Sequence, residues 1–264
     1  MIMTEITWEQ IDLAAAEAGL PVAVGGSLAP HRVLEALRYG AFPMPCTGEY
    51  AVETNRALYH DLVQEGLIIG FPRPEPGGRY ALTWWCPPTR PVVASDGVHL
   101  SRKLRRDLRH KHQWITTCDH AFAEVVEHCR DQRASPWITD ELTESLLALH
   151  HAGWAHSIEV WNGEDLIGGV FGTGMGAVFS AESTFHRQPD AGKVAFADLG
   201  RRLWLTRPGS LIDVQVPSVF ATSLGAEPLP RTEFLAALAD IDLPLTPHRG
   251  VFQAAGLADA GGGD

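Results

Sequence analysis

The 264-residue sequence lacks several features that would place it in a specialised class of protein. Its four cysteines, Cys46, Cys86, Cys118 and Cys129, are too few and too scattered for a disulfide framework. The first residues show no basic start followed by an apolar core, which argues against a signal peptide. No apolar run is long enough to span a membrane. These absences predict a cytoplasmic globular protein without a membrane partner.

Positive charge is also scarce, with 21 Lys and Arg against 32 Asp and Glu and a net charge of −11. This balance argues against a general nucleic-acid coat protein. One short stretch is an exception, because it holds six basic residues: Arg102, Lys103, Arg105, Arg106, Arg109 and Lys111. A solvated helix face and a phosphate-binding surface both explain such a run. Composition alone leaves both readings open.

The common catalytic and metal-binding motifs are missing as well. The phosphate-loop pattern fails at Arg187 and Val194, and residues 172–176 do not have the spacing of a dinucleotide fingerprint. No Gly-x-Ser-x-Gly elbow is present. The most metal-like set has spacings that match no usual zinc site, and comprises Cys118, His120, His128 and Cys129. We therefore predict no metal and no cofactor.

The middle of the chain predicts a three-stranded antiparallel meander. Polar and apolar residues alternate from His156 to Trp161, and Asn162-Gly163 then gives a strong hairpin signal. An apolar run over 166–173 leads to a second tight turn at residues 174–176, and a third strand follows over 177–185. A further strand is predicted over residues 211–216.

Capping residues and helical spacing predict helices elsewhere in the chain. They cover residues 7–18, 30–39, 55–64, 102–111, 119–130, 140–151, 193–204 and 231–239. Asp119 is the expected cap of the helix over 119–130, and Thr139 that of the helix over 140–151.

Two carboxylates stand inside otherwise apolar strands, and they mark a candidate site. Glu182 lies within the third meander strand, and Asp213 lies within the strand over 211–216. Burying a carboxylate costs several kcal/mol unless it is paired. Strict alternation would place Asp213 and Gln215 on one face of their strand. A structural ion pair explains one such residue, whereas two carboxylates with an amide favour a functional site.

Adjacent tryptophans precede a diproline at residues 83–90. On an extended segment, neighbouring side chains point to opposite faces. We therefore expect one of Trp84 and Trp85 to pack inward while the other can stack on a ligand.

Several of these stretches together resemble the leucyl/phenylalanyl-tRNA–protein transferase family. They are VGGSLAPHRVLEALRYGAFP, WWCPPTR, PWIT, HSIEVWNGEDLIGGVFG, AESTF, LIDVQV and SLGAEPLPRTEF. They occur in the family's order and cover most of residues 22–238.

The resemblance implies an α+β fold. Residues 96–245 would form an acetyltransferase-like (GNAT-like) catalytic domain, with a mixed or antiparallel sheet flanked by helices. Residues 1–95 would form a smaller N-terminal α/β domain with an insertion at about 46–83. Independently of the resemblance, the glycine-rich composition from Ala254 predicts a flexible C-terminal tail, which we place at residues 246–264.

The resemblance also implies the reaction and the residues that perform it. Leucine or phenylalanine, and by similarity of size methionine, would pass from aminoacyl-tRNA to an N-terminal Arg or Lys and mark the acceptor for the N-end rule pathway. The enzyme would be a monomer. The implied catalytic residues are Asp213, Gln215 and Glu182, and Trp85 and Trp137 would hold the 3′ adenosine. Phe171, Phe179 and Phe185 would form the donor side-chain pocket, and the six basic residues from Arg102 to Lys111 would bind tRNA.

Two rival functions remain open. An acyl-CoA-dependent acyltransferase of the same fold would need a glycine-rich pyrophosphate loop, but residues 186–193 contain one glycine. A catalytically inactive protein that binds tRNA or protein N-termini would keep the basic helix and the tryptophans but would show no turnover.

Overall fold

The computed structural model describes residues 7–73, 78–132, 137–238 and 242–259. It has an α+β architecture with two mixed sheets, as predicted. The chain divides into two compact units. The first comprises Met1–Thr89, Ala134–Ala148 and Pro230–Leu238, and the second Arg90–Arg133, Leu149–Leu229 and Ala239–Asp264. None of the described helices is long and apolar enough to cross a membrane.

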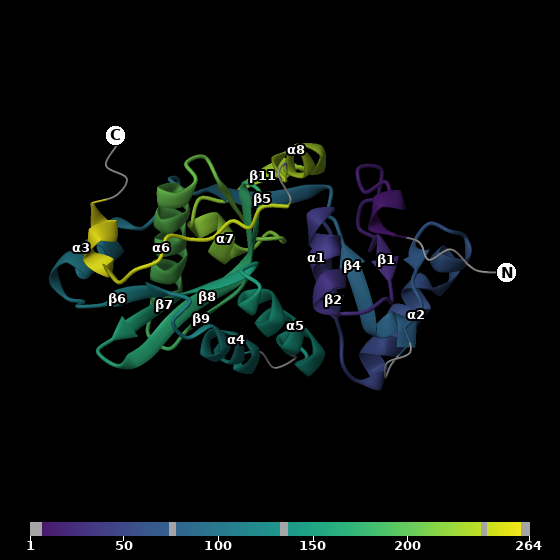
Figure 1. Ribbon diagram of the computed structural model, residues 1–264, viewed down its shortest axis with the longest axis horizontal. Coiled ribbons are helices and arrows are strands. Elements are labelled where there is room, and N and C mark those ends of the chain that lie inside the picture. Colours follow the sequence, from purple (N-terminus) through teal and green to yellow (C-terminus); the bar gives the residue numbers. More distant parts are fainter. Residues whose placement is uncertain (1–6, 74–77, 133–136, 239–241, 260–264) are drawn as a thin grey trace. The chain divides into compact units, whose positions relative to one another are not determined.

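The first unit is built on a four-stranded sheet (Figure 1). Its order is β2 (Phe42–Pro45), β4 (Leu82–Trp85), β1 (Ala23–Val24), β3 (Ile69–Gly70). The other elements are η1 (Trp8–Gln10), α1 (Pro30–Arg38), α2 (Glu49–Gln64), η2 (Gly78–Ala81), most of α5 (Asp140–His151) and α8 (Arg231–Ala237). Trp84 anchors the core, because it is 1% exposed and packs edge-on against Trp8 at 5.1 Å between ring centroids.

The N-terminal prediction is wrong in length. We expected a helix over residues 7–18, but only the three-residue 3-10 helix η1 forms. The carboxylate of Asp12 accepts hydrogen bonds from the backbone N–H groups of Ala14 and Ala15. This local bonding competes with helical hydrogen bonds and ends the helix early. The cap itself is correct, since Thr7 and Gln10 form a capping box.

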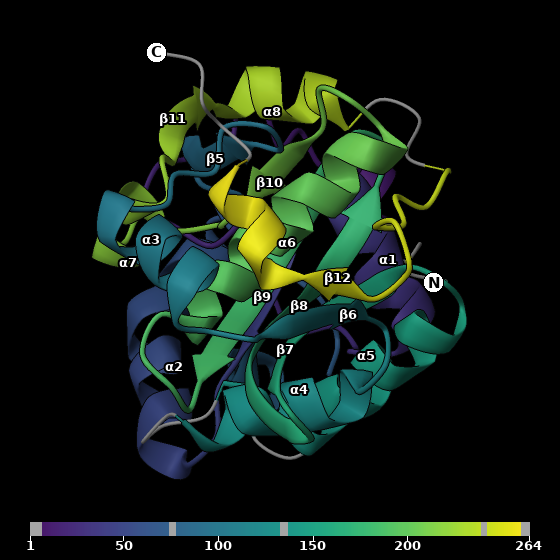
Figure 2. The ribbon, with the colours of Figure 1, turned by 90° about the vertical axis from the view of Figure 1, so that its left-hand side faces the viewer.

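The second unit contains an eight-stranded sheet (Figure 2). Its order is β11 (Glu227–Pro230), β5 (Thr89–Ala94), β10 (Leu211–Asp213), β9 (Val178–His186), β8 (Asp165–Met175), β7 (Ala155–Asn162), β6 (Ile115–Cys118), β12 (Phe252–Gln253). Its helices are α3 (Arg102–His110), α4 (Phe122–Asp131), α6 (Ala191–Thr206), α7 (Val219–Ser223) and the 3-10 helix η3 (Ala254–Ala258). The predicted meander is confirmed as β7, β8 and β9, which pair antiparallel in sequence.

Two helices cover opposite faces of this meander (Figures 1 and 2). A Cβ added to Gly168 of β8 would meet Ala191 of α6, whereas one added to Gly169 would meet Val125 of α4. Because successive strand residues point to opposite faces, α6 covers one face and α4 the other. The α6 face holds the main core, with Ile212, Phe179 and Val194 among its buried residues.

Two further predictions are corrected here. Asp119 does not cap a helix, because α4 begins at Phe122 and Asp119 itself has a φ of +59°. The C-terminal segment is not flexible over residues 252–258, since β12 pairs with β6 and Leu257 of η3 is only 4% exposed. Apolar residues within an otherwise glycine-rich tail supply this packing.

Candidate active site

The site is built where the parallel strands β9 and β10 lie side by side. Their register places Asp213 beside Ser180. Gln215 follows the end of β10, and Glu182 lies two residues beyond Ser180 on β9. The Gln215 amide nitrogen donates to the Glu182 carboxylate at 2.7 Å. The three polar residues predicted as catalytic are therefore together.

A β-bulge places Glu182 at this point. Phe171 pairs with Ser183 and Gly172 pairs with Ala181, so Glu182 is the extra residue of β9. A bulge redirects the side chain of the extra residue and increases the local twist. Here it turns the Glu182 carboxylate towards Gln215 and the hydroxyl of Thr173, which lies 3.5 Å away.

Gly172 makes the bulge possible, and this gives a testable prediction. A Cβ at this position would lie 2.1 Å from the backbone oxygen of Ser180. Gly172→Ala should therefore force the strands apart and lower the free energy of unfolding by roughly 1–3 kcal/mol, as overpacking does. Thermal unfolding tests this, with Gly192→Ala as control, because there a Cβ would come no nearer than 3.3 Å to any neighbour. Equal stability of the two variants would contradict the bulge geometry.

The backbone at Gln215 differs from the strand that we predicted. β10 ends at Asp213, and Gln215 adopts a left-handed conformation with a φ of +61°. Its backbone N–H donates to the Asp213 carboxylate at 2.9 Å, as in an Asx turn. A non-glycine residue in this region stores strain that surrounding contacts must hold, and such residues cluster at functional sites. The Asp213 side chain thus fixes the position of Gln215.

Asp213 is itself held by four donors. Arg90 contacts both carboxylate oxygens, with its Nε 3.1 Å from Oδ1 and its Nη2 on Oδ2. The Ser180 hydroxyl donates to Oδ2 at 3.0 Å, and the Gln215 N–H occupies Oδ1. Arg90 and Asp213 are 2% and 0% exposed. A carboxylate offers about four lone-pair positions, so these four donors leave Asp213 no free position for a hydrogen bond from a substrate.

Glu182 has a different environment. It keeps partial exposure to solvent, and its neighbours raise its pKa to about 7. Burial by surrounding protein is the main cause, and the negative charge of Asp213 adds to it, while hydrogen bonds from Gln215 and Thr173 act in the opposite direction. A carboxyl group with a pKa near neutrality can accept a proton in a reaction at physiological pH. Of Glu182, Asp213 and Gln215, Glu182 is therefore the residue whose chemistry suits a general base.

Arg90, Ser180 and Thr173 were not identified from the sequence. In the sequence, Arg90 is only the last residue of the WWCPPTR motif. It reaches Asp213 because β5 pairs with β10, which sets Val92 opposite Asp213. A buried Asp in a strand does signal that a cation is needed nearby. The sequence does not say which one.

The three predicted pocket phenylalanines are fully buried but do not share one face. Phe171 packs against Phe122 of α4, and Phe185 packs against His128 of the same helix. Phe179 pairs with Gly174 of β8 and belongs to the core beneath α6. Strand alternation therefore places Phe171 and Phe185 on the face of Asp213 and Phe179 on the opposite face. The three phenylalanines therefore do not line a single pocket.

The tryptophans of the first unit behave as the extended segment predicted. Trp84 is buried and donates from Nε1 to Gly25 at 2.8 Å, whereas Trp85 remains partly exposed and donates to Thr83. Trp137 is also partly exposed. Partial exposure leaves ring surface on which a ligand can stack.

The basic residues of α3 are organised around one acid. Asp107 is 5% exposed, and the ammonium groups of Lys103 and Lys111 each lie 3.0 Å from its carboxylate. These two contacts hold the pKa of Asp107 at about 2. Arg106 approaches the same group, while Arg109 binds Asp259. At least four of the six predicted tRNA-binding side chains therefore have partners within the protein, and Lys103, Arg106 and Lys111 remain more than half exposed.

The possible zinc set from the sequence is not assembled. The only cluster with metal-ligand proximity in the described ranges is Asp119, His150 and His156. Both ring nitrogens of His156 face acceptors, namely the Asp119 carboxylate at 2.8 Å and the Gly153 carbonyl at 3.1 Å. These contacts already occupy both ring nitrogens of His156, so the cluster is accounted for by hydrogen bonding within the protein.

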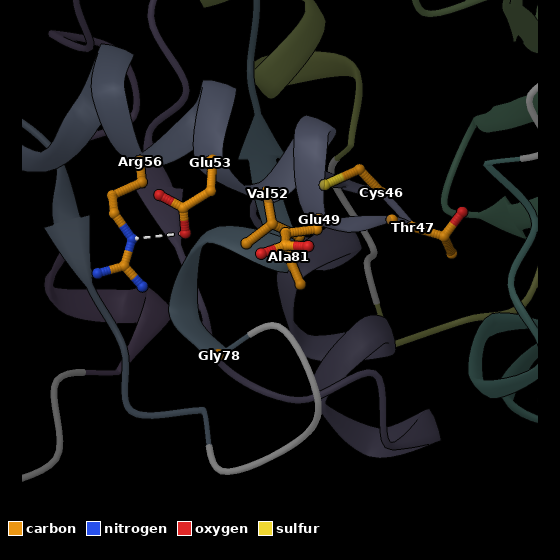
Figure 3. Close-up of a pocket in the computed structure, with 9 residues that line it drawn as sticks. Cys46, Thr47, Glu49, Val52, Glu53, Arg56, Gly78 and Ala81 are labelled. Atoms are coloured by element: carbon orange, nitrogen blue, oxygen red, sulfur yellow. Dashed lines mark ion pairs between the residues drawn. The ribbon is translucent and has the colours of Figure 1, made fainter.

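A pocket of about 560 Å³ lies in the first unit, next to the start of α2 (Figure 3). Its lining includes Cys46, whose thiol pKa is raised by burial, and an ion pair between Glu53 and Arg56 at 3.3 Å. None of the predicted site residues lines it.

Comparison with known proteins identifies the family. Residues 92–239 match the family model described as leucyl/phenylalanyl-tRNA protein transferase. The leucyl/phenylalanyl-tRNA–protein transferase of Shewanella baltica (strain OS195) is 36% identical over 240 residues, covering 89% of this chain and 87% of the relative. That of Stutzerimonas stutzeri (strain A1501) is also 36% identical, covering 89% and 91%. The chain belongs to this family.

Within the leucyl/phenylalanyl-tRNA–protein transferase family, the matched region spans α3 and the whole Glu182, Asp213 and Gln215 constellation. The crystal structure of a conserved protein of unknown function from Bacteroides thetaiotaomicron VPI-5482 aligns with 92% of this chain and with 97% of the chain in that structure. Its TM-score of 0.39 and identity of 10% are too low to carry an argument.

Proposed function

We propose that this protein transfers leucine or phenylalanine from aminoacyl-tRNA to the N-terminal residue of acceptor proteins. The observation that carries this proposal is the contrast between a saturated Asp213 and a Glu182 with a pKa of about 7, joined by Gln215. Acceptors would begin with Arg or Lys, and the product would be an N-degron. The chain would act as a monomer in the cytoplasm, with a GNAT-like catalytic domain over residues 96–245.

In this mechanism the acceptor's α-amine attacks the ester carbonyl of the aminoacyl-tRNA. A C–N bond forms and the ester C–O bond breaks, and the 3′ oxygen of the terminal adenosine leaves as a hydroxyl. Glu182 takes the proton that the amine loses and gives it to the leaving 3′ oxygen. The amide nitrogen of Gln215 donates to Glu182, so its amide oxygen is the acceptor that orients the amine. Arg90 and Asp213 hold this geometry through their buried ion pair.

Trp85, Trp137 and the basic helix α3 support aminoacyl-tRNA as the donor substrate. We assign Trp85 and Trp137 to stacking on the terminal adenosine, because an exposed aromatic ring is the usual platform for an unpaired base. Phe171 and Phe185, on the face of Asp213, remain candidates for the donor side-chain pocket. An apolar pocket of this kind excludes charged side chains but discriminates weakly between leucine and methionine.

Salt dependence tests the role of α3. Arg106 is 67% exposed, and Arg106→Ala should weaken tRNA binding and reduce the slope of log affinity against log salt by about 1. Arg56→Ala on α2 is the control, since it removes an arginine that is 54% exposed and lies outside the basic helix. If the two variants change the slope equally, α3 is not the phosphate-binding element.

A peptide beginning with arginine tests the reaction. Incubated with Leu-tRNA or Phe-tRNA and this protein, it should gain the mass of one aminoacyl residue, and a peptide with an acetylated N-terminus should gain none. Binding of tRNA without any gain would favour the inactive binding protein. Acylation from an acyl-CoA in place of the tRNA would favour the acyl-CoA-dependent enzyme.

A further inference from the structure

A second pocket in the second unit has no role in the chemistry above. It has a volume of about 310 Å³ and lies among four segments: the chain that follows β5, and α3, α6 and η3. Figure 2 shows η3, in yellow, beside α6 and α3. This volume lies at the lower end of the range of small-ligand pockets. It is large enough for a single flat ring with a polar substituent.

Its walls suit an aromatic ring. Trp204 of α6 is 41% exposed and forms one wall. The lining also includes the apolar side chains of Leu100 and Leu257, both 4% exposed. A half-exposed tryptophan ring beside apolar side chains offers a surface on which a nucleic-acid base of any identity can stack.

The polar groups of the pocket suit a nucleotide. Arg105, from the basic run of α3, and Arg201 of α6 both line it. Arg201 is held in place, since its Nε donates to Asp198 at 2.8 Å and its guanidinium lies 4.5 Å from the Phe252 ring centroid. Ser95 is 3% exposed, and within the part of the chain that the structure describes its hydroxyl has no hydrogen-bond partner. Asp96 adds an exposed carboxylate that can accept from an exocyclic amine.

The C-terminal segment closes this pocket. Arg109 of α3 donates to the Asp259 carboxylate at 2.8 Å and also to the Ala258 carbonyl. These bonds fix η3 against α3 and so place Leu257 in the wall. The C-terminal segment, which its composition predicted to be flexible, thus contributes Leu257 to a pocket beside α3.

We propose that this pocket holds one unpaired nucleotide of the RNA substrate, with its base against Trp204 and its phosphate near Arg105. This inference rests on the proposed use of tRNA. The ligand is distinct from the terminal adenosine, which we assign to Trp85 and Trp137. Duplex nucleotides cannot enter, because their bases are already stacked and paired. The pocket would therefore recognise single-stranded RNA next to a backbone that α3 binds.

Comparing two RNA ligands distinguishes binding of a base in this pocket from general binding of phosphates. We would measure affinities of full-length tRNA and of a blunt-ended RNA duplex by fluorescence anisotropy at one salt concentration. Trp204→Ala should weaken tRNA binding at least about tenfold, within the range for loss of one stacked base. It should leave the duplex affinity and the salt dependence unchanged. Trp204→Phe, which keeps a stacking ring, should retain most of the tRNA affinity.

Leu205→Ala is the matched control, because Leu205 is the next residue of α6, is 55% exposed and does not line the pocket. It should bind both RNAs like the unaltered protein. Equal tRNA affinities for Trp204→Ala and Leu205→Ala would overturn the proposal, as would an equal loss for both RNAs. If tRNA binding depends on Trp204 but no aminoacyl transfer occurs, the pocket stands and the proposed function fails. If transfer occurs but Trp204→Ala does not change tRNA affinity, the proposed function stands and the nucleotide pocket is ruled out.

Discussion

Glu182→Gln is expected to slow aminoacyl transfer by roughly 10²-fold at pH 8, in line with the loss of a general base. The substitution keeps the size of the side chain and its hydrogen-bonding capacity towards Gln215, but it removes the group that accepts the proton. Affinity for aminoacyl-tRNA should not change, because Glu182 acts on the amine. Single-turnover transfer to an arginyl peptide measures the rate, and anisotropy measures the affinity.

Ser183→Ala provides the control for that variant. Ser183 follows Glu182 in the bulge, is 6% exposed, and within the described ranges its hydroxyl has no hydrogen-bond partner. Its removal should leave the transfer rate within about twofold, because replacing such a hydroxyl loses no bond. If Glu182→Gln and Ser183→Ala transfer equally fast, the rate depends on positioning of the substrates alone.

Arg90→Met should lower the free energy of unfolding by about 3–5 kcal/mol, because it leaves the buried Asp213 carboxylate without its cation. Activity should fall with stability, since Asp213 fixes the strained backbone of Gln215. Urea titration followed by circular dichroism measures the effect. Arg56→Met is the matched control, because the Arg56–Glu53 pair is more than half exposed on both sides. Such a pair contributes about 0–1 kcal/mol.

A double variant distinguishes lost charge pairing from lost packing. Arg90→Met with Asp213→Leu should recover most of the stability lost in Arg90→Met, because apolar residues can replace a buried ion pair. It should not recover activity, since the Gln215 N–H then has no carboxylate to bind. A single Arg90→Met variant as stable as Arg56→Met would contradict the account of Asp213.

Regular periodicity explains why the meander could be predicted. The alternation over residues 156–161, the Asn162-Gly163 turn and the second glycine turn produce β7, β8 and β9 with their expected pairing. The helices over 30–39 and 140–151 also form, and Thr139 accepts the expected bond from the N–H of Leu142. These features depend on residues that are close in sequence, so a single sequence contains their signal.

The geometry of the site could not be predicted in the same way. Glu182 points where it does because of a bulge, and Gln215 because of a left-handed backbone, and both interrupt the regular strand that alternation assumes. Arg90 reaches Asp213 across a distance of 123 residues in sequence. Local patterns do not encode such pairings. The sequence therefore indicated that Glu182, Asp213 and Gln215 belong together, but not that four donors surround Asp213 or that the pKa of Glu182 is raised to about 7.

The most direct test is the pH dependence of transfer by the unaltered protein and by Glu182→Gln. Glu182 works as a base only when deprotonated, so the rate of aminoacyl gain on an arginyl peptide should rise with pH and level off above the pKa of about 7. The peptide's own amine adds a second rise near its pKa of about 8, which both proteins share. We predict that Glu182→Gln keeps the second rise and loses the first. Identical profiles for the two proteins would contradict the assignment of Glu182 as the proton acceptor.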